Sequence, residues 1–293
     1  MERTALPAFG YVTKSYSLLT KPRIIMGNII CTAGGLALAS RGSIHFWLFM
    51  GTLLGLSFVI ASACVFNNFI DREADKKMAR TQDRALASGT ISVKNAILFA
   101  LSLGLTGSWV LYRFTNLLTV GIALFGFVVY VLLYSYSKYH SMHGTLIGSV
   151  AGAVPPVVGY CAVSNQLDLG AMLFFLMMVL WQMPHFFAIA IYRLDDYSKA
   201  SIPVLPVKKG IRTTKIQMVL YIIAFTLASS MLTLCGYTGY GYLTVASATG
   251  LIWLWVGLQG FKCEDDQLWA RKMLRLSLIA ITALCIAIPF SVV

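Results

Sequence analysis

Nine long apolar segments dominate this chain, and they constrain its fold more than any other feature. Each is close to the roughly 20 residues that an α-helix needs to cross a bilayer. They span residues 24–40, 46–66, 94–112, 116–136, 144–163, 169–191, 215–236, 240–260 and 276–293. Only 12% of the residues are charged, against about 25% in a soluble domain. The sequence therefore predicts an all-α, polytopic membrane bundle of nine transmembrane helices.

The formal net charge of +12 comes from Lys and Arg residues whose distribution along the chain matches the predicted membrane topology. Of the 23 Lys and Arg residues, all but Arg41 and Arg113 lie in segments that nine alternating spans place on one side of the membrane. The positive-inside rule makes this side cytoplasmic, so we expect a cytoplasmic N-terminus and an external C-terminus in a bacterial inner membrane. Because topology accounts for the basic residues, we expect no nucleic-acid partner.

Residues 1–293 are expected to form a single domain, because no linker of low complexity divides them. Two long polar segments, 67–93 and 192–214, follow the second and sixth spans. These spans run in the same direction and lie four spans apart, which is the layout of a duplicated four-helix unit with an active site between its halves. Pro155 and Pro156 are expected to break the fifth span, and Pro184 to disturb the sixth.

The end of the second span carries an acidic pattern. No Gly or Pro occurs between positions 58 and 88, so the helix can continue beyond the membrane surface. Asn67, Asp71 and Asp75 then recur every four residues and share one helix face. Carboxylate and amide oxygens clustered in this way suit Mg²⁺, which completes its coordination shell with phosphate oxygens and water.

Arg80 and Arg84 follow this acidic face and are again four residues apart. Guanidinium groups bind phosphate in a bidentate manner, so acidic and basic residues together outline a diphosphate site. The alternative is a solvated helix extension in which the two aspartates pair with Arg72 and Lys76.

A second polar cluster, Asp195, Asp196 and Lys199, follows the sixth span. It could hold a second metal or the other end of a diphosphate. Equally, it could only terminate the helix and contribute to the charge pattern of the cytoplasmic side. These residue types alone do not decide between the two.

His185 lies within the sixth span, where a polar residue usually faces a cavity or the bundle interior. It could serve as a base, a hydrogen-bond donor or an iron ligand, or it could bond a backbone carbonyl freed by Pro184. Lys138, His140 and His143 belong to a cytoplasmic loop that is either simply solvated or in contact with an acidic group of a substrate.

Three tyrosines near the cytoplasmic face, at positions 130, 134 and 136, fit an interfacial aromatic belt. Their ring faces could also stabilise a carbocation.

Several motifs carry a resemblance to a known family. The stretch Asn67-x-x-x-Asp71-x-x-x-Asp75 followed by Met78-x-Arg80-Thr81-x-x-Arg84-x-Leu86-x-x-Gly89 resembles the first signature of the UbiA superfamily of intramembrane prenyltransferases. Thr20-Lys21-Pro22-Arg23 before the first span also resembles that superfamily. Three further motifs resemble those of one group within that superfamily, the haem O synthases. They are Trp181-x-x-Pro184-His185-Phe186, Tyr192-x-x-Asp195-Asp196-Tyr197 and Pro203-x-Leu205-Pro206-Val207. Ala85 departs from the pattern where such families usually have Pro.

This resemblance implies a bundle around a central cavity that opens to the cytoplasmic face, with Mg²⁺, farnesyl diphosphate and haem B as ligands. The implied activity joins the farnesyl group to a haem vinyl group with addition of water, which yields haem O. A terminal oxidase or a haem A synthase would receive the product. The implied catalytic residues are Asn67, Asp71, Asp75, Asp195 and Asp196, with the first three on the metal. The implied substrate-binding residues are Arg23, Arg80, Arg84, Lys138, Lys199 and His185.

Two other functions remain open. The same chemistry could act on a 4-hydroxybenzoate or quinone precursor, although His185, Trp181 and Pro184 favour haem. A transporter or non-enzymic haem carrier is the alternative from another class, but the acidic residues cluster at one membrane face and do not thread through the spans.

Overall fold

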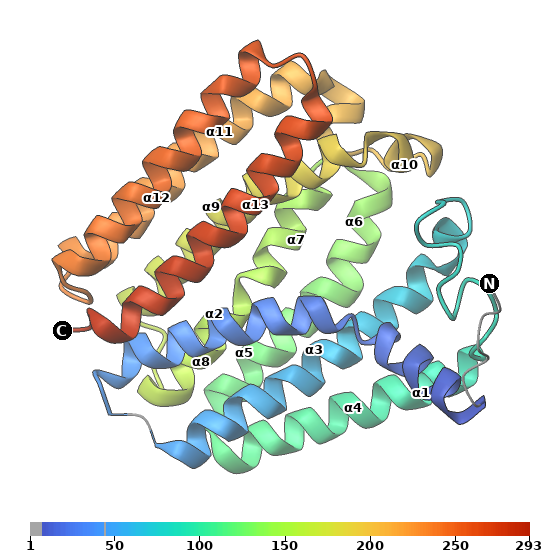
Figure 1. The fold of residues 1–293 in the computed structure, drawn as a ribbon. Helices are drawn as coiled ribbons and strands as arrows, with labels where there is room; N and C mark the ends of the chain where they lie inside the picture. The colour runs from blue at the N-terminus through green and yellow to red at the C-terminus, as the bar shows by residue number, and fades with distance from the viewer. Residues whose placement is uncertain (1–7, 44) are drawn as a thin grey trace.

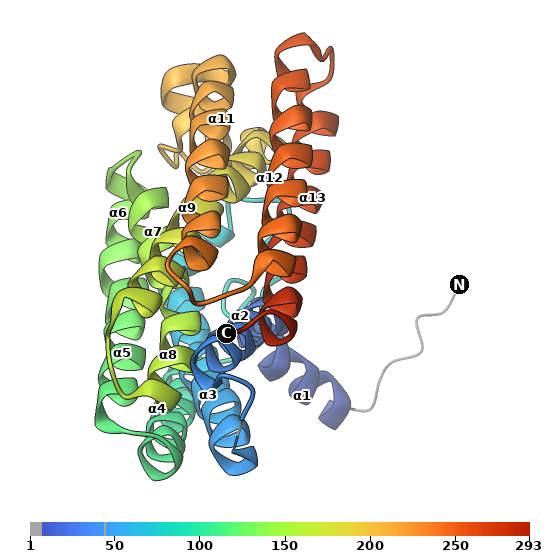
Figure 2. The same ribbon diagram turned by 90° about the vertical axis from the view of Figure 1, so that its left-hand side faces the viewer.

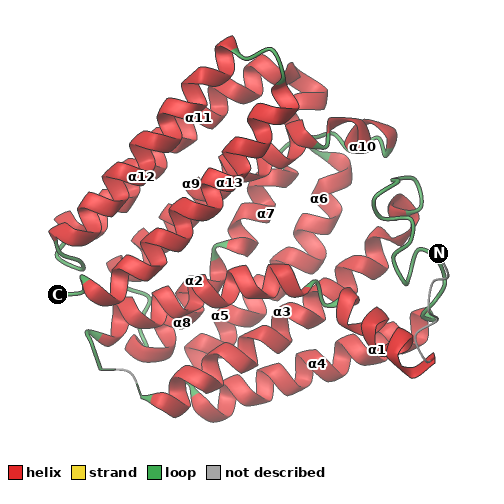
Figure 3. Cartoon of the chain, in the orientation of Figure 1, coloured by secondary structure: helices red, strands yellow, loops and turns green. Residues whose placement is uncertain are grey.

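The computed structural model describes residues 8–43 and 45–293 (Figure 1). Within this part of the chain, nine helical stretches are long and apolar enough to cross a membrane. They are α2 (Pro22–Ser40), α3 (Phe46–Asp75), α4 (Val93–Phe114), α5 to α6 (Leu117–His140), α7 to α8 (Gly144–Ser164), α9 (Leu169–Tyr192), α11 (Leu205–Leu234), α12 with η2 (Tyr240–Lys262) and α13 with η3 (Asp266–Phe290). The predicted all-α bundle of nine membrane helices is confirmed. In Figure 3 helices and the loops between them make up the described chain, and the longest loop joins α3 to α4.

Two helices begin about ten residues before the spans predicted from the sequence. α11 starts at Leu205 and not at position 215, and α13 starts at Asp266 and not at position 276. The Asp265 carboxylate accepts a hydrogen bond from the Leu268 amide at 2.9 Å and so caps α13. Apolar content locates only the part of a helix inside the bilayer, because charged turns beyond it are helical too.

The helices pack as neighbouring pairs around the bundle. α3 packs along α4, α2 along α8, and α9 against both α11 and α13. Figures 1 and 2 place α12 and α13 side by side on one flank and α3 and α4 on the other. Two shorter helices, α1 (Ala8–Leu19) and α10 (Leu194–Lys199), lie at the end of the bundle that also carries segment 76–92, whereas the C-terminus lies at the opposite end (Figure 1). The two long polar segments therefore share one end.

In the fifth span, the prolines break the helix as predicted. α7 (Gly144–Gly152) ends before Ala153, and α8 (Val154–Ser164) begins with Pro155 and Pro156 in its first turn, where proline is tolerated. In the sixth span, α9 continues from Leu169 to Tyr192 with Pro184 inside it.

Glycines allow α2 and α8 to approach closely. A Cβ on Gly159 would overlap the Thr32 carbonyl, and a Cβ on Gly35 would overlap the Pro156 carbonyl. Both obstacles are backbone atoms, so neither can turn away. Small residues serve this purpose in membrane bundles, where packing drives helix association.

Replacing Gly159 with Ala is therefore expected to push α2 away from α8 and to destabilise the protein by about 1–3 kcal/mol. Thermal size-exclusion analysis in detergent should reveal this as a melting temperature lowered by several degrees. The matched control is Gly121→Ala in α5 (Leu117–Val128), where no atom lies within 4 Å of an added Cβ. Equal melting temperatures for the two variants would show that the close approach contributes nothing.

Candidate active site

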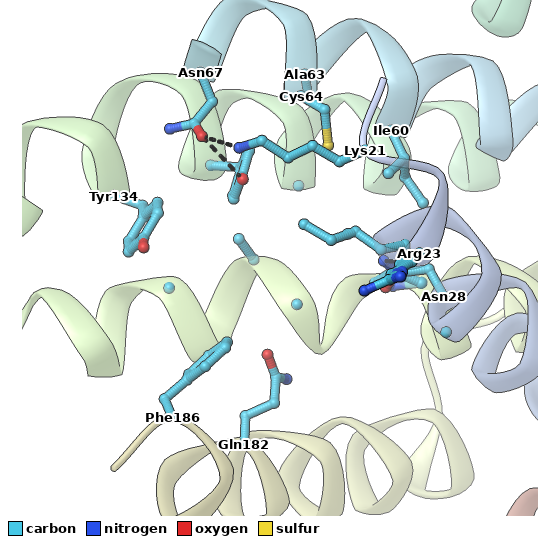
Figure 4. Close-up of a pocket in the computed structure, with 18 of the residues that line it drawn as sticks. Lys21, Arg23, Asn28, Ile60, Ala63, Cys64, Asn67, Tyr134, Gln182 and Phe186 are labelled. Atoms are coloured by element: carbon cyan, nitrogen blue, oxygen red, sulfur yellow. Dashed lines mark hydrogen bonds between the residues drawn. The ribbon is translucent and has the colours of Figure 1, made fainter. Parts of the chain in front are cut away.

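A cavity of about 670 Å³ lies between α2, α3, α7, α9 and α13. One part of its lining is polar and comes mainly from the C-terminal end of α3. Another part is apolar and aromatic and comes mainly from α9. In Figure 4, Asn67 and Tyr134 line one side of the space, while Gln182 and Phe186 extend from α9 on the other.

The predicted acidic face of α3 forms and is buried. Asn67, Asp71 and Asp75 are only 2%, 3% and 2% exposed, and all three line the cavity. α3 is helical from Phe46 to Asp75, so the spacing of four does place the three side chains on one face, as predicted. Buried carboxylates need compensating charge, and the structure supplies it from distant parts of the chain.

Each of the three residues contacts a different basic side chain. Lys21 Nζ donates to Asn67 Oδ1 at 2.6 Å. Lys138 Nζ lies 2.8 Å from Asp71 Oδ2. Arg84 Nη1 lies 2.8 Å from Asp75 Oδ2 and 3.0 Å from its Oδ1. Three cations and two buried carboxylates thus meet at the polar end of the cavity.

The solvated helix extension that the sequence left open is not what the structure contains. Arg72 and Lys76 pair with Glu73, at 3.6 and 3.0 Å, on the exposed side of α3. Arg72 also lies over the Phe69 ring, 4.4 Å from its centroid. The surface charges of α3 therefore satisfy one another and leave the two cavity aspartates to other partners.

The arginines after α3 do not continue its helix. α3 ends at Asp75, and residues 76–92 form consecutive turns. This segment folds back, so that Arg84 reaches Asp75 and Arg80 lines the cavity. Thr81 Oγ1 supports the fold-back by donating to the Asp75 carbonyl at 3.0 Å. The sequence predicted that Arg80 and Arg84 lie near the acidic face, but it did not predict this fold-back of the backbone.

The sequence analysis did not select Lys21 as a site residue, although it lay in the motif before the first span. Lys21 precedes Pro22 and adopts the left-handed conformation, with φ at 53°. This conformation is uncommon for a residue with a Cβ and marks a constrained position. Desolvation in the cavity lowers the pKa of the Lys21 ammonium. The pairing with Asn67 joins residues 46 positions apart, which local patterns cannot reveal.

Tyrosines from the fourth span complete the polar end. A π-helical segment, η1 (Val129–Tyr134), presents Tyr130 and Tyr134 to the cavity with their rings stacked at a centroid distance of 5.4 Å. π-helical turns often occur at functional sites. Tyr139, from α6 (Ser135–His140), donates to Asp71 Oδ1 at 2.6 Å and was not predicted. Tyr136 instead is 69% exposed, as an interfacial belt residue would be.

The other predicted site residues divide into two groups. Arg23, like Arg80, lines the cavity although it is largely exposed. Asp195, Asp196 and Lys199 lie on α10 and are absent from the cavity lining of the described chain. Asp195 and Lys199 are exposed, and Asp196 lies 4.0 Å from Arg193. Their roles as catalytic and substrate-binding residues stay predictions.

Tyr197 is the residue of α10 that faces the cavity. Burial raises the pKa of its phenol, so the group stays neutral near the site. The sequence analysis quoted Tyr197 within a motif without assigning it a role.

The apolar wall is formed around His185. Its Nδ1 lies 2.7 Å from Ser277 Oγ on α13, and its ring stacks on Trp181 at 4.9 Å between centroids. Trp181 Nε1 donates to the Ser277 carbonyl at 2.8 Å. The partner of His185 is thus a serine on another helix and not a carbonyl freed by Pro184. His140 and His143 are exposed, as a solvated loop predicts.

The residues at the polar end fit a Mg²⁺ ion brought in with phosphate. Two carboxylates and one amide oxygen are the hard ligands that Mg²⁺ prefers, and it usually keeps water and phosphate oxygens in its remaining positions. No group of three or more His, Cys, Asp and Glu side chains suited to a metal occurs in residues 8–43 and 45–293. The donor set therefore suits a substrate-dependent ion better than a fully protein-enclosed one.

Comparison with known proteins agrees with this geometry. Residues 28–279 match the model of the UbiA prenyltransferase family. The chain belongs to the UbiA prenyltransferase family. It is 58% identical over 278 residues to the protoheme IX farnesyltransferase of Protochlamydia amoebophila, covering 95% of this chain and 98% of that protein. It is 52% identical over 281 residues to the protoheme IX farnesyltransferase of Serratia proteamaculans, covering 95% of each. The resemblance inferred from the motifs is confirmed.

Solved structures share the fold of this UbiA family member. A digeranylgeranylglyceryl phosphate synthase superposes with a TM-score of 0.77 at 20% identity, covering 95% of this chain and 97% of that one. A UbiA homologue from Archaeoglobus fulgidus, bound to GPP and Mg²⁺, superposes with a TM-score of 0.71 at 14% identity, covering 94% and 99%. Membership of this family makes the chain an enzyme and disfavours the transporter or carrier alternative.

Proposed function

We propose that this protein transfers a farnesyl group from farnesyl diphosphate to a vinyl group of haem B, with Mg²⁺ as cofactor and with addition of water. The products are haem O and diphosphate. The observation that carries the proposal is the buried Asn67, Asp71 and Asp75 face with a cation on each residue. It lies in the same cavity as the aromatic wall around His185. The protoheme IX farnesyltransferases that are 52–58% identical to the chain support haem as the acceptor.

At the polar end, this chain's residues bind and neutralise the diphosphate. When bound, Mg²⁺ would be held by Asn67, Asp71 and Asp75 and would draw electron density from the departing phosphate oxygens. Arg84, Lys138 and Lys21 contact the side-chain oxygens of these three residues, so their charges would lie beside the diphosphate and take up the charge that develops as the carbon–oxygen bond breaks. Charge that is preorganised for the transition state is the largest single contribution in many enzymes.

At the apolar end, the aromatic wall around His185 would position the acceptor. Tyr130 and Tyr134 present ring faces beside the polar end, where a farnesyl cation would gain from their quadrupoles. The vinyl group supplies the electron pair for the new carbon–carbon bond. Water then adds to the resulting cation next to the porphyrin and releases one proton, so the product carries a hydroxyethylfarnesyl group.

The proposed location is a bacterial inner membrane, with the basic end in the cytoplasm, the N-terminus inside and the C-terminus outside. Segment 76–92 supports this orientation, because it carries four Lys and Arg residues at one end of the bundle (Figure 1). A terminal oxidase or a haem A synthase is the proposed recipient of the product.

The test is an assay with purified protein, haem B, farnesyl diphosphate and Mg²⁺, read by mass spectrometry. We expect farnesylated, hydrated haem and stoichiometric diphosphate, with both lost on chelation of Mg²⁺. Parallel reactions replace haem B with 4-hydroxybenzoate. Product from 4-hydroxybenzoate and none from haem would assign the chain to another acceptor and refute the proposal.

A further inference from the structure

Ser277 lies at the centre of the apolar wall and holds two rings of α9 at once. Its side chain is fully buried in α13. The backbone carbonyl accepts from Trp181 Nε1 at 2.8 Å, and the hydroxyl oxygen lies 2.7 Å from His185 Nδ1. A buried serine with two contacts to another helix is not required by membrane insertion. Its effect on His185 follows from counting protons.

The single proton of the Ser277 hydroxyl has a partner already, because Oγ donates to the Leu274 carbonyl at 2.7 Å. With that proton directed to Leu274, the oxygen accepts a hydrogen bond from Nδ1, and Nδ1 then carries the imidazole proton. In a neutral imidazole only one nitrogen is protonated. Ser277 consequently selects the tautomer whose Nε2 has a free lone pair.

Nε2 is open to the cavity. It has no hydrogen-bond partner among the described residues. It is also not one of the fully buried side-chain nitrogen and oxygen atoms that lack a partner in this part of the chain, so it is accessible from the cavity. The His185 ring lines the cavity, and α9 and α13 also contribute Met178 and Ile281 to the lining, which offer neither a proton nor a charge. The stacked Trp181 indole restricts rotation of the ring. A fixed, unprotonated nitrogen in apolar surroundings is the form in which histidine binds metal ions.

We propose that His185 Nε2 is an axial ligand to the iron of the haem substrate, and that Ser277 is the positioning residue that fixes its tautomer and orientation. The inference rests on the proposed function, because haem must enter this cavity. Histidine ligands commonly donate their second ring N–H to an oxygen, and loss of that partner typically costs 10- to 100-fold in metal affinity. The iron–nitrogen bond would set the depth and tilt of the porphyrin in the cavity.

The experiment measures haem binding to the full-length protein in detergent without farnesyl diphosphate. Wild-type protein with ferrous haem B is expected to give an iron–histidine stretching band in resonance Raman spectra, and this band should shift when the histidines are labelled with ¹⁵N. His185 alone of the histidines in the described chain lines the cavity. His185→Gly should lose the band, and added imidazole should restore it.

Ser277→Ala should keep the band at a shifted frequency and weaken haem affinity about 10-fold or more. The matched control is Ser229→Ala, because Ser229 is also fully buried but bonds only Phe225 of its own helix α11. Its spectrum and affinity should equal those of wild type.

The outcomes separate this inference from the proposed function. A wild-type spectrum without a histidine band, or one unchanged in His185→Gly, overturns the axial ligand even if haem is farnesylated. A histidine band that depends on His185, together with no farnesyl transfer to haem, supports the ligand and refutes the proposed reaction. If His185→Gly does not fold, the ¹⁵N shift in wild type and the Ser277→Ala spectrum still decide the question.

Discussion

Asp71→Asn is expected to reduce farnesyl transfer about 10²- to 10³-fold, the effect of removing a preorganised electrostatic contact from an active site. Asp71 is buried, and its two oxygens are held by Lys138 at 2.8 Å and Tyr139 at 2.6 Å. Asparagine has nearly the same shape but no charge, so it would hold a cation less strongly and cannot balance the charge of Lys138. The turnover number should fall while the protein still elutes as a folded species.

Glu73→Gln is the matched control for Asp71→Asn. Glu73 lies on the same helix only two positions away, but its side chain is 65% exposed and pairs with Lys76 outside the cavity. Turnover should stay within about twofold of wild type, since exposed ion pairs contribute little. Equal loss in both variants would mean that general charge on α3, and not the cavity face, controls the activity. Full activity of folded Asp71→Asn would refute the metal assignment.

Arg84→Lys is expected to give the second-largest loss, about 10- to 100-fold in kcat/KM for farnesyl diphosphate. One nitrogen of Arg84, Nη1, serves both oxygens of Asp75. Its Nε and Nη2 have no hydrogen-bond partner in the described chain, so they remain free for phosphate. A lysine keeps the charge but presents a point ammonium that cannot bridge the two groups. Losing a hydrogen bond to a charged group costs about 1.5–3 kcal/mol.

The control for Arg84 is Arg72→Lys, because Arg72 lies on the outer side of α3 with Glu73 and Phe69. Steady-state kinetics with varied farnesyl diphosphate should show the loss for Arg84→Lys and none for Arg72→Lys. The expected pattern is a raised KM for the diphosphate with the haem KM unchanged. An unchanged KM for Arg84→Lys would place its guanidinium outside the substrate contacts.

The fold followed from the sequence because membrane insertion depends on local composition. Each apolar segment must form its own hydrogen bonds in lipid, so helices are the only choice for it. The acidic face of α3 was equally local, since a spacing of four in an uninterrupted helix fixes the side on which Asn67 and Asp75 lie. Pro155 and Pro156 marked the break between α7 and α8 for the same reason.

What the sequence could not determine depends on contacts between distant segments. Lys21 reaches Asn67 and Lys138 reaches Asp71 across 46 and 67 positions, and no periodicity encodes such pairs. Segment 76–92 is not helical and folds back on α3, which brings Arg84 to the buried Asp75. Asp195 and Lys199 had the residue types of a second site, yet α10 leaves them exposed and turns Tyr197 to the cavity.

The sequence by itself determined the all-helical membrane fold, the family, and the helix face on which the acidic residues lie, because each depends on side-chain spacing or composition within one segment. Only the tertiary structure decided which cations meet those acids and that the His185 ring meets the Ser277 hydroxyl of α13. The physical reason is that burying a charge or an imidazole requires a partner at hydrogen-bond distance. That partner is chosen by the packing of whole helices.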